Sequence, residues 1–209
     1  MGDYLANKHS LLDHFALFAI PRKLRIDSAK LEARFHTLQM ASHPDKFASS
    51  DPVAIELAEN TSASINQAYR VLREPIARLK YLLSLYGYSV ERSKAVPQSL
   101  LMSVMEAQEA IGGLEMAQNP SEVDALRSAL SDLSVSFDNK LSQIADDRKR
   151  LSAEWDAANE HAKDRESLTE SERNILDQLV KLLAERAYLE TLSASIHAAL
   201  AGETAMIRH

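Results

Sequence analysis

The tripeptide His43-Pro44-Asp45 lies between two stretches of helical apolar spacing, and its proline limits how this part of the chain can fold. Proline disfavours the right-handed helical conformation of the residue before it, so His43 marks the end of a helix, and Asp45 can stabilise the turn that follows. In the stretch before the tripeptide, Asp27 is the expected N-cap, and three apolar residues share one face: Leu31, Phe35 and Leu38.

The stretch after the tripeptide is expected to begin a second helix at Asp51-Pro52, because aspartate is a preferred N-cap and proline is favoured in the first turn. The apolar positions expected on this helix are Val53, Ile55, Leu57, Ala58, Ile65, Ala68, Tyr69 and Leu72. Two helices joined in this way predict an antiparallel hairpin with a polar tip.

The composition favours an all-α chain. The 209 residues include only five glycines and six prolines, and runs of β-branched residues are few, which leaves little material for a sheet. A hydrophobic content of 45% is enough for one sizeable core or two small ones.

The chain contains no cysteine, which excludes disulfides, thiolate chemistry and cysteine ligation of zinc or of an iron–sulfur cluster. Its seven histidines are scattered without the spacing of helical metal ligands, so we expect no metal site and no cofactor. No apolar run approaches the roughly 20 residues that span a bilayer, and the N-terminus lacks a secretory apolar region. These features predict a cytoplasmic protein that does not enter a membrane.

The charge pattern points toward a protein partner. A formal net charge of −6 argues against general nucleic-acid binding. The segment from Pro21 to Lys46 differs from the rest, because it holds six basic residues against three acidic ones and is locally +3. This segment is suited to an acidic partner surface.

Breaks along the chain predict its domain limits. Residues 1–12 are expected to be a loose lead-in. Glu74-Pro75 should end the second helix and begin a third over 76–86, which Gly87 is placed to end. Residues 88–97 are the expected linker, and 98–209 the expected second domain.

The second domain is expected to contain three helices. The first covers about 99–117, with Gly112-Gly113 weakening its end. Two long apolar seams, from Val123 to Trp155 and from Ile175 to Leu200, should pack on each other as an antiparallel hairpin. Thr169 and Glu172 form a predicted capping box at the start of the last helix.

The helix at 99–117 is apolar over more of its circumference than one core contact requires. At about 100° per residue, one set stays within about 40° of Leu100: Val104, Ala107 and Ile111. A second set lies at about 100°, 140° and 200° from it: Leu101, Met105 and Met102. The second set cannot all face the same core. Either these residues contact a partner protein, or the long hairpin wraps around the helix and covers them.

Three sequence strings resemble a known family: His43-Pro44-Asp45-Lys46-Phe47, Ile65-Asn66-Gln67-Ala68-Tyr69 and Arg78-Leu79-Lys80-Tyr81-Leu82-Leu83-Ser84-Leu85-Tyr86-Gly87. With the preceding run Phe15-Ala16-Leu17-Phe18, they resemble a J domain and, more narrowly, the HscB family of J-domain co-chaperones. The resemblance is close from about Asp13 to Tyr88 and places the J domain at 13–87. It implies a J domain followed by a helical domain that binds an iron–sulfur scaffold protein.

The resemblance also implies a chaperone-binding site. In this family the tripeptide docks on a DnaK-class chaperone, here HscA, and promotes its ATP hydrolysis. The corresponding residues are His43, Pro44 and Asp45, with Lys46 beside them. Lys30 and Arg34 lie four residues apart on the preceding helix and would supply electrostatic attraction. The alternative for these two residues is ordinary surface charge.

A second implied site binds the scaffold protein IscU. The segment of the family that contacts the scaffold corresponds to Leu101, Met102 and Met105, and Glu106 and Glu109 would form a polar rim. Tyr188 corresponds to an aromatic contact on the last helix, or else it is a core tyrosine. The two glutamates are otherwise ordinary solvated residues.

Together these features predict a co-chaperone without catalytic residues that presents IscU to HscA and aids iron–sulfur cluster assembly and transfer. Eukaryotic members of the family that the chain resembles can carry an N-terminal cysteine pair that binds zinc. This sequence has no such pair, so the resemblance favours a bacterial type. The alternative is a general J-domain co-chaperone with another client or with a dimerising C-terminal hairpin. A helix-turn-helix reader of DNA and a hydrolase using His43 with Asp45 fit less well, because the helix connection is long, the chain is acidic and no nucleophile is adjacent.

Overall fold

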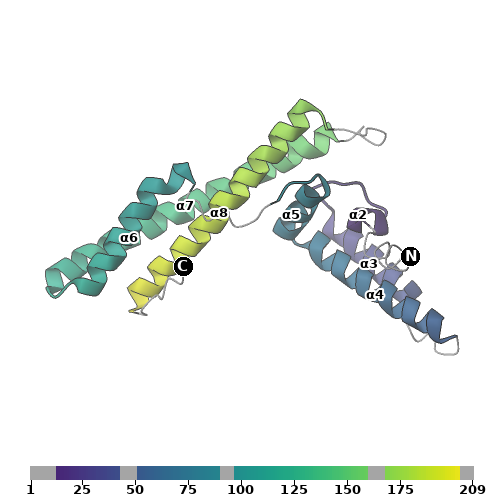
Figure 1. The fold of residues 1–209 in the computed structure, drawn as a ribbon, viewed down its shortest axis with the longest axis horizontal. Helices are drawn as coiled ribbons and strands as arrows, with labels where there is room; N and C mark the ends of the chain where they lie inside the picture. The colour runs from purple at the N-terminus through teal and green to yellow at the C-terminus, as the bar shows by residue number, and fades with distance from the viewer. Residues whose placement is uncertain (1–12, 43–50, 90–96, 160–167, 203–209) are drawn as a thin grey trace, which may run out of the picture. The chain divides into compact units, whose positions relative to one another are not determined.

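The computed structural model describes residues 13–42, 51–89, 97–159 and 168–202. These residues form helices and their connections, without a β-strand among them (Figure 1). The prediction of an all-α chain is confirmed. No helix in the described ranges has both the length and the apolar character needed to cross a bilayer.

The chain divides into two compact units, and one helix contributes to both. The first unit consists of Met1–Tyr88 with Ser152–Leu168, and the second of Ser89–Leu151 with Thr169–His209. Helix α7 runs without interruption from Pro120 to Ala158. The boundary between the units therefore falls inside an α-helix, and the last two turns of α7 belong to the first unit.

The first unit contains four described helices before α7: α2 (His14–Leu17), α3 (Ser28–Ser42), α4 (Pro52–Arg73) and α5 (Pro75–Leu85). Helices α3 and α4 form the predicted hairpin (Figure 1). Both predicted N-caps are present, since the Asp27 carboxylate accepts the backbone N–H of Ala29 at 3.0 Å and the Asp51 carboxylate accepts that of Val53 at 3.1 Å. Helix α3 is described as far as Ser42, and the tripeptide at 43–45, with the helix end predicted there, lies outside the described residues.

The buried face of α4 begins later along the helix than its run of apolar residues. The helix buries Ala58, Ile65, Ala68 and Leu72 in the core of the first unit. Val53 and Leu57, which are among the apolar positions expected on this helix, have exposed side chains. Both lie in the first two turns of α4, before its first buried residue, Ala58, and Leu57 is only about 20° around the helix from the buried Ala68, so their position along the helix rather than its phase leaves them exposed.

Helix α5 begins and ends where two sequence breaks predict it. Pro75 occupies its first turn, and Tyr86 is its C-cap. Gly87 follows with a φ of +80°, and the N–H groups of Gly87 and Tyr88 donate to the carbonyls of Ser84 and Leu83 at 3.1 and 3.0 Å. This pair of bonds is a Schellman motif, which requires a residue that tolerates the left-handed conformation.

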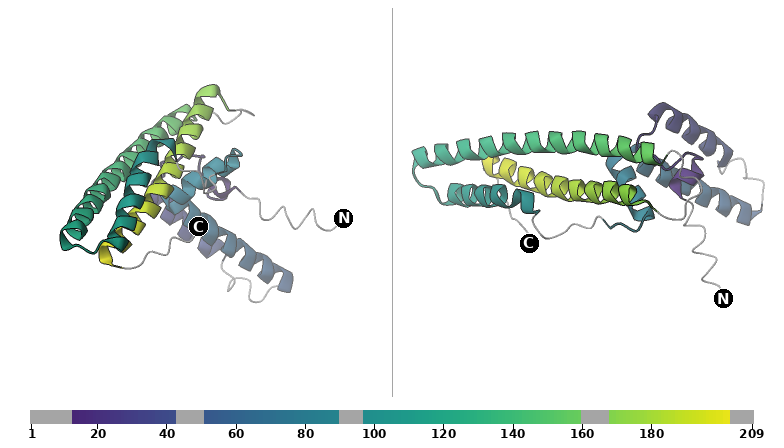
Figure 2. Two further views of the ribbon diagram at one scale, coloured as in Figure 1. Left: turned by 60° about the vertical axis from the view of Figure 1, so that its left-hand side comes forward. Right: turned by 90° about the horizontal axis from the view of Figure 1, so that it is seen from above.

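The second unit is the predicted three-helix arrangement, built from α6 (Leu101–Met116), most of α7 and α8 (Glu170–Ala201), with the short 3-10 turn η3 (Gln98–Leu100) before α6. Figure 2 shows α6 and α8 beside the long α7. All three helices contribute to one core, which consists of Leu100, Val104, Ala107, Ala110, Ile111, Leu130, Phe137, Ile144, Leu189, Leu192 and Ile196.

Two local features predicted from the sequence can be compared with this unit: the capping box of α8 and the glycine pair in α6. The predicted capping box of α8 is confirmed, because the Thr169 hydroxyl accepts the Glu172 N–H at 3.2 Å and the Glu172 carboxylate accepts the Thr169 N–H at 2.7 Å. Helix α6 continues through Gly112-Gly113 to Met116. A Cβ atom at Gly113 would lie 3.3 Å from the Leu126 side chain, so this glycine allows α6 and α7 to approach closely.

Candidate protein-interaction sites

The α3–α4 hairpin is held together by contacts spread along its length. The rings of Phe35 and Tyr69 stack with their centroids 4.1 Å apart. Nearer the tip, the Ser62 hydroxyl donates to the Gln39 side-chain oxygen at 3.1 Å, and the Gln39 amide donates to the Ser62 carbonyl at 3.4 Å. These contacts hold α3 against the middle and second half of α4.

The predicted chaperone-binding residues divide into two groups. His43, Pro44, Asp45 and Lys46 lie outside the described residues, so their role stays a prediction. Lys30 and Arg34 are exposed on α3, where a partner can reach them.

Asp27, the N-cap of α3, forms an ion pair with Lys30. Lys30 approaches the Asp27 carboxylate at 3.6 Å in a solvent-exposed ion pair. Such pairs contribute little to stability, so Lys30 can exchange this contact for one with a partner at low cost. The backbone N–H of Lys30 donates to the Asp27 carboxylate and, as the largest contribution, lowers the pKa of Asp27.

Exposed apolar side chains lie near the ends of α3 and α4 that adjoin residues 43–50, and their exposure was not predicted from the sequence. Met40 lies near the end of α3, and Val53 and Leu57 lie in the first two turns of α4. At about 100° per residue, Met40 is opposite the buried Leu31, so a helical wheel would have found it.

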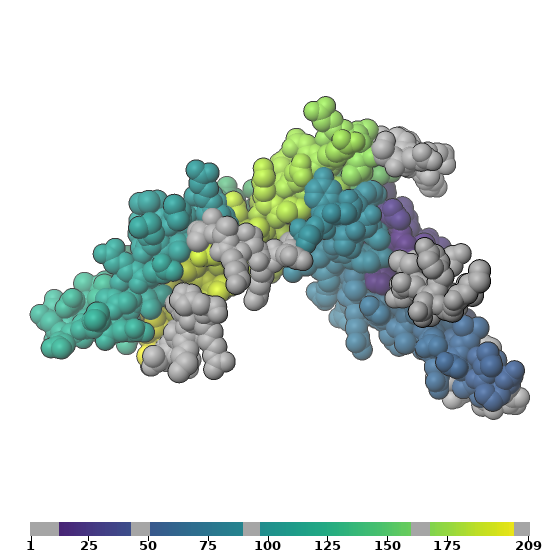
Figure 3. All heavy atoms as spheres, in the orientation of Figure 1, coloured from purple at the N-terminus to yellow at the C-terminus, as the bar shows by residue number. Residues whose placement is uncertain are grey.

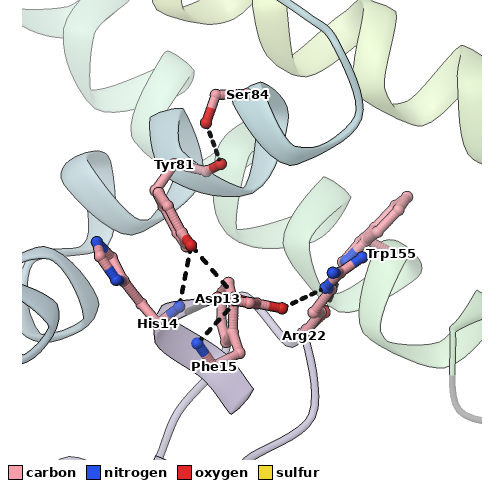
Figure 4. Close-up of polar contacts among 7 residues, drawn as sticks. All are labelled: Asp13, His14, Phe15, Arg22, Tyr81, Ser84 and Trp155. Carbon is pink, nitrogen blue, oxygen red and sulfur yellow. Dashed lines mark hydrogen bonds and ion pairs between the residues drawn. The ribbon is translucent and has the colours of Figure 1, made fainter. Parts of the chain in front are cut away.

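A polar network at the start of the first unit joins α2 to α5 (Figure 4). The Asp13 carboxylate accepts the Phe15 N–H at 3.0 Å and the Arg22 guanidinium at 2.8 Å. The Tyr81 hydroxyl donates to Asp13 at 3.4 Å and accepts the His14 N–H at 2.9 Å. Burial raises the pKa of Tyr81, which keeps its hydroxyl protonated as a donor. The network fixes the short helix α2 against α5.

The end of α7 supplies two further side chains to the same unit. Trp155 lies beside Arg22 (Figure 4), and its indole N–H donates to the Arg22 carbonyl at 3.2 Å. The Trp155 ring also packs edge-on against Tyr86, with centroids 5.3 Å apart. The buried Asp156 carboxylate accepts the backbone N–H groups of Leu24 and Arg25 at 2.6 and 2.9 Å. The pattern placed Trp155 in a helical seam, but no sequence signal indicated which backbone groups these side chains bind.

A buried arginine on α5, Arg78, also binds the segment between α2 and α3. Arg78 on α5 donates from Nε to the Leu24 carbonyl at 2.9 Å and from a terminal nitrogen to the Leu72 carbonyl. Leu24 therefore has both backbone polar groups bound by side chains, one from α5 and one from α7. The segment between α2 and α3, which has no helix of its own, is held in place by these bonds.

On the second unit, the predicted scaffold-binding residues form an exposed apolar surface, the α6 patch, defined as Leu101, Met102 and Met105. Their side chains are 47%, 68% and 57% exposed. Figure 3 shows α6 contributing to the outer surface of its unit. Of the two alternatives left by the sequence, coverage by the α7–α8 hairpin is wrong, because neither helix shields these side chains.

The remaining predicted residues of this site differ in position. Glu106 and Glu109 are exposed on α6 beside the patch. Tyr188 on α8 is half-buried and packs against the core of the second unit, so much of its ring is engaged within the chain. Among the described residues, no cluster of three or more histidines or carboxylates is arranged to hold a metal ion.

Two solved structures that resemble the chain over 90% of its length are HscB proteins. The crystal structure of human co-chaperone protein HscB matches with a TM-score of 0.56 and 24% sequence identity, over 81% of that chain. The chaperone HscB from Vibrio cholerae matches with a TM-score of 0.58 and 24% identity, over 99% of that chain. The chain has the HscB fold. The predicted resemblance to HscB is thus confirmed at the level of the fold, while no protein-family model matches the sequence.

Proposed function

We propose that this chain is a J-domain co-chaperone of iron–sulfur cluster assembly. The observation that carries the proposal is the sequence His43-Pro44-Asp45 between α3 and α4 in a chain with the HscB fold. In this proposal the chain performs no bond chemistry of its own and acts in the cytoplasm by binding two proteins.

The first proposed partner is the DnaK-class chaperone HscA. The α3–α4 hairpin would present His43, Pro44, Asp45 and Lys46 to it, and the exposed Lys30 and Arg34 on α3 would add electrostatic attraction. The chain would promote ATP hydrolysis by binding more tightly to the hydrolysis-competent conformation of HscA than to other conformations.

The second proposed partner is the iron–sulfur scaffold IscU. The α6 patch offers three flexible or branched apolar side chains whose exposure leaves them available to a partner. Fully burying one such side chain contributes roughly 1.5–3 kcal/mol before the costs of association. Burial of three is enough for a transient complex, which suits a client that is handed on to HscA.

Substitution of the tripeptide tests the chaperone half of the proposal. His43→Gln should abolish stimulation of the HscA ATPase while leaving IscU affinity and the helical circular dichroism unchanged. His36→Gln is the matched control, because His36 is an exposed histidine on α3 outside the tripeptide. Equal stimulation by the wild type and His43→Gln would contradict the assignment of this segment.

Substitution of the α6 patch tests the client half. Replacing Leu101, Met102 and Met105 with alanine should weaken IscU binding in calorimetric titration and leave direct stimulation of HscA intact. Val135→Ala is the control, since Val135 is an exposed apolar residue of α7. If wild-type protein stimulates HscA but does not bind IscU, the chain is instead a J-domain co-chaperone with a different client.

A further inference from the structure

A further exposed apolar side chain lies at the far end of α6, beyond the patch. Met116, in the last turn, is 82% exposed. With Leu100 as the origin and about 100° per residue, Leu101, Gly112, Met105 and Met116 fall at about 100°, 120°, 140° and 160°. These four residues form one line along the helix, here called the α6 stripe. It is about 22 Å long, because each helical residue rises about 1.5 Å.

Nothing among the described residues accounts for the glycine at position 112 of this stripe. A Cβ atom placed there would meet nothing within 4 Å, whereas one at the neighbouring Gly113 would press on Leu126 at 3.3 Å. Glycine inside a helix lowers its stability, and a positive φ, which would require glycine, is found at Gly87 and Gly202 but not at Gly112. An exposed glycine on an apolar stripe allows the backbone of another helix to approach closely.

Acidic residues border the stripe on both sides. Glu115 lies at about 60°, Glu109 at about 180° and Glu106 at about 240° in the same frame, and all three are exposed. The sequence from Leu101 to Met116 contains no lysine or arginine, so this helix has a charge of −3. The surface therefore combines flexible apolar side chains with a negative border, and the complementary partner carries aliphatic and basic side chains.

We propose that the α6 stripe docks a basic amphipathic helix of the client protein, which crosses α6 at Gly112. The proposal relies on the proposed function in taking the occupant to be part of the client. It extends the contact surface from the first turns of α6 to its last turn. It also specifies the chemistry of the bound segment, namely aliphatic residues flanked by lysine or arginine.

A designed peptide tests this chemistry without the natural client. The probe is a labelled amphipathic helical peptide of leucine and lysine, about four turns long, and its counterpart has glutamate in place of lysine. In fluorescence anisotropy, the full-length protein should bind the lysine peptide, less tightly as salt increases, and should not bind the glutamate peptide. Equal binding of both peptides would overturn the proposal.

Substitutions in the second half of the stripe locate the binding site. Gly112→Gln inserts a long side chain at the crossing point, and Met116→Ala removes apolar contact area. Each should weaken binding of the lysine peptide by about tenfold. Gly112→Gln should not lower thermal stability, since glutamine is the better helix former and the position is open. The control Val135→Ala should bind like the wild type, and unchanged peptide binding by both stripe variants would overturn the proposal.

The same variants separate this proposal from the proposed function. If the patch variants lose IscU binding while Gly112→Gln and Met116→Ala retain it, the client assignment stands and the extended stripe is wrong. If the stripe binds the lysine peptide but the wild type neither binds IscU nor stimulates HscA, the stripe stands and the proposed function is wrong.

Discussion

At the scale of single residues, the position of Asp156 has two opposing effects on the pKa of its carboxyl group. Its side chain is 8% exposed, and this burial raises the pKa of the carboxyl above its ordinary value of 3.8. The N–H groups of Leu24 and Arg25 donate to the ionised form, and the charges of Lys23 and Arg25 also favour it. Burial is the larger effect, so the carboxylate satisfies two backbone groups at some electrostatic cost.

Replacing Asp156 with asparagine should lower the free energy of unfolding by about 1–3 kcal/mol at neutral pH. The amide oxygen can accept one of the two N–H groups, but the amide NH2 then faces the other. Urea titration followed by Trp155 fluorescence measures the loss, because Trp155 is the only tryptophan and lies next to the substitution. A loss below a few tenths of a kcal/mol would show that water replaces these bonds.

The pH dependence of this difference follows from the raised pKa. The folded state holds the Asp156 proton more tightly than the unfolded state, so this group stabilises the wild type as the pH falls through its folded pKa toward 3.8. The asparagine variant lacks this gain. The stability difference between wild type and variant should therefore widen on acidification, measured by the same titration at a series of pH values. A difference that narrows would contradict the direction of the pKa shift.

At the scale of helices, the features that sequence predicts are those fixed by neighbouring residues. The caps at Asp27 and Thr169 and the helix end before Gly87 each depend on a few residues in a row, and all are present in the structure. The apolar pattern of α6 showed that Leu101, Met102 and Met105 cannot share the core face of Leu100, but it left open whether α7 and α8 cover them, and only the structure shows that they are exposed. The exposure of Val53 and Leu57 did not follow from the sequence, since apolar character alone does not say how much of α4 its neighbours cover.

Gly87 gives a direct test of a helix end. Alanine at a φ of +80° is strained, and nothing lies within 4 Å of the new Cβ atom, so the cost comes from the backbone alone. Gly87→Ala should lower the free energy of unfolding by about 1–2 kcal/mol in urea titration. Gly87→Asn is the control and should cost less, because asparagine tolerates the left-handed conformation. Equal losses for the two variants would exclude backbone strain as the cause.

At the scale of the whole molecule, the unit boundary inside α7 is the feature that sequence could not supply. The apolar seam of this helix is interrupted at Arg148 but resumes at Leu151 and Trp155, so periodicity does not assign the last turns to another compact unit. The bonds of Trp155 to Arg22 and of Asp156 to Leu24 join residues more than 130 positions apart in the chain. Such contacts depend on the tertiary fold and have no local signature.

Because α7 is continuous, a substitution that destabilises the second unit should also shift the unfolding transition reported by Trp155 in the first unit. The seven residues from Ser152 to Ala158 are too few for a stable isolated helix, so they depend on the rest of α7. Leu130→Ala, a substitution in the buried core of the second unit, should cost about 2–5 kcal/mol. It should move the urea transition of Trp155 fluorescence to lower concentration together with that of the helical circular dichroism. Val135→Ala, at an exposed position of the same helix, should move neither. If Leu130→Ala shifts only the circular dichroism and leaves the Trp155 transition in place, the two units unfold independently despite the shared helix.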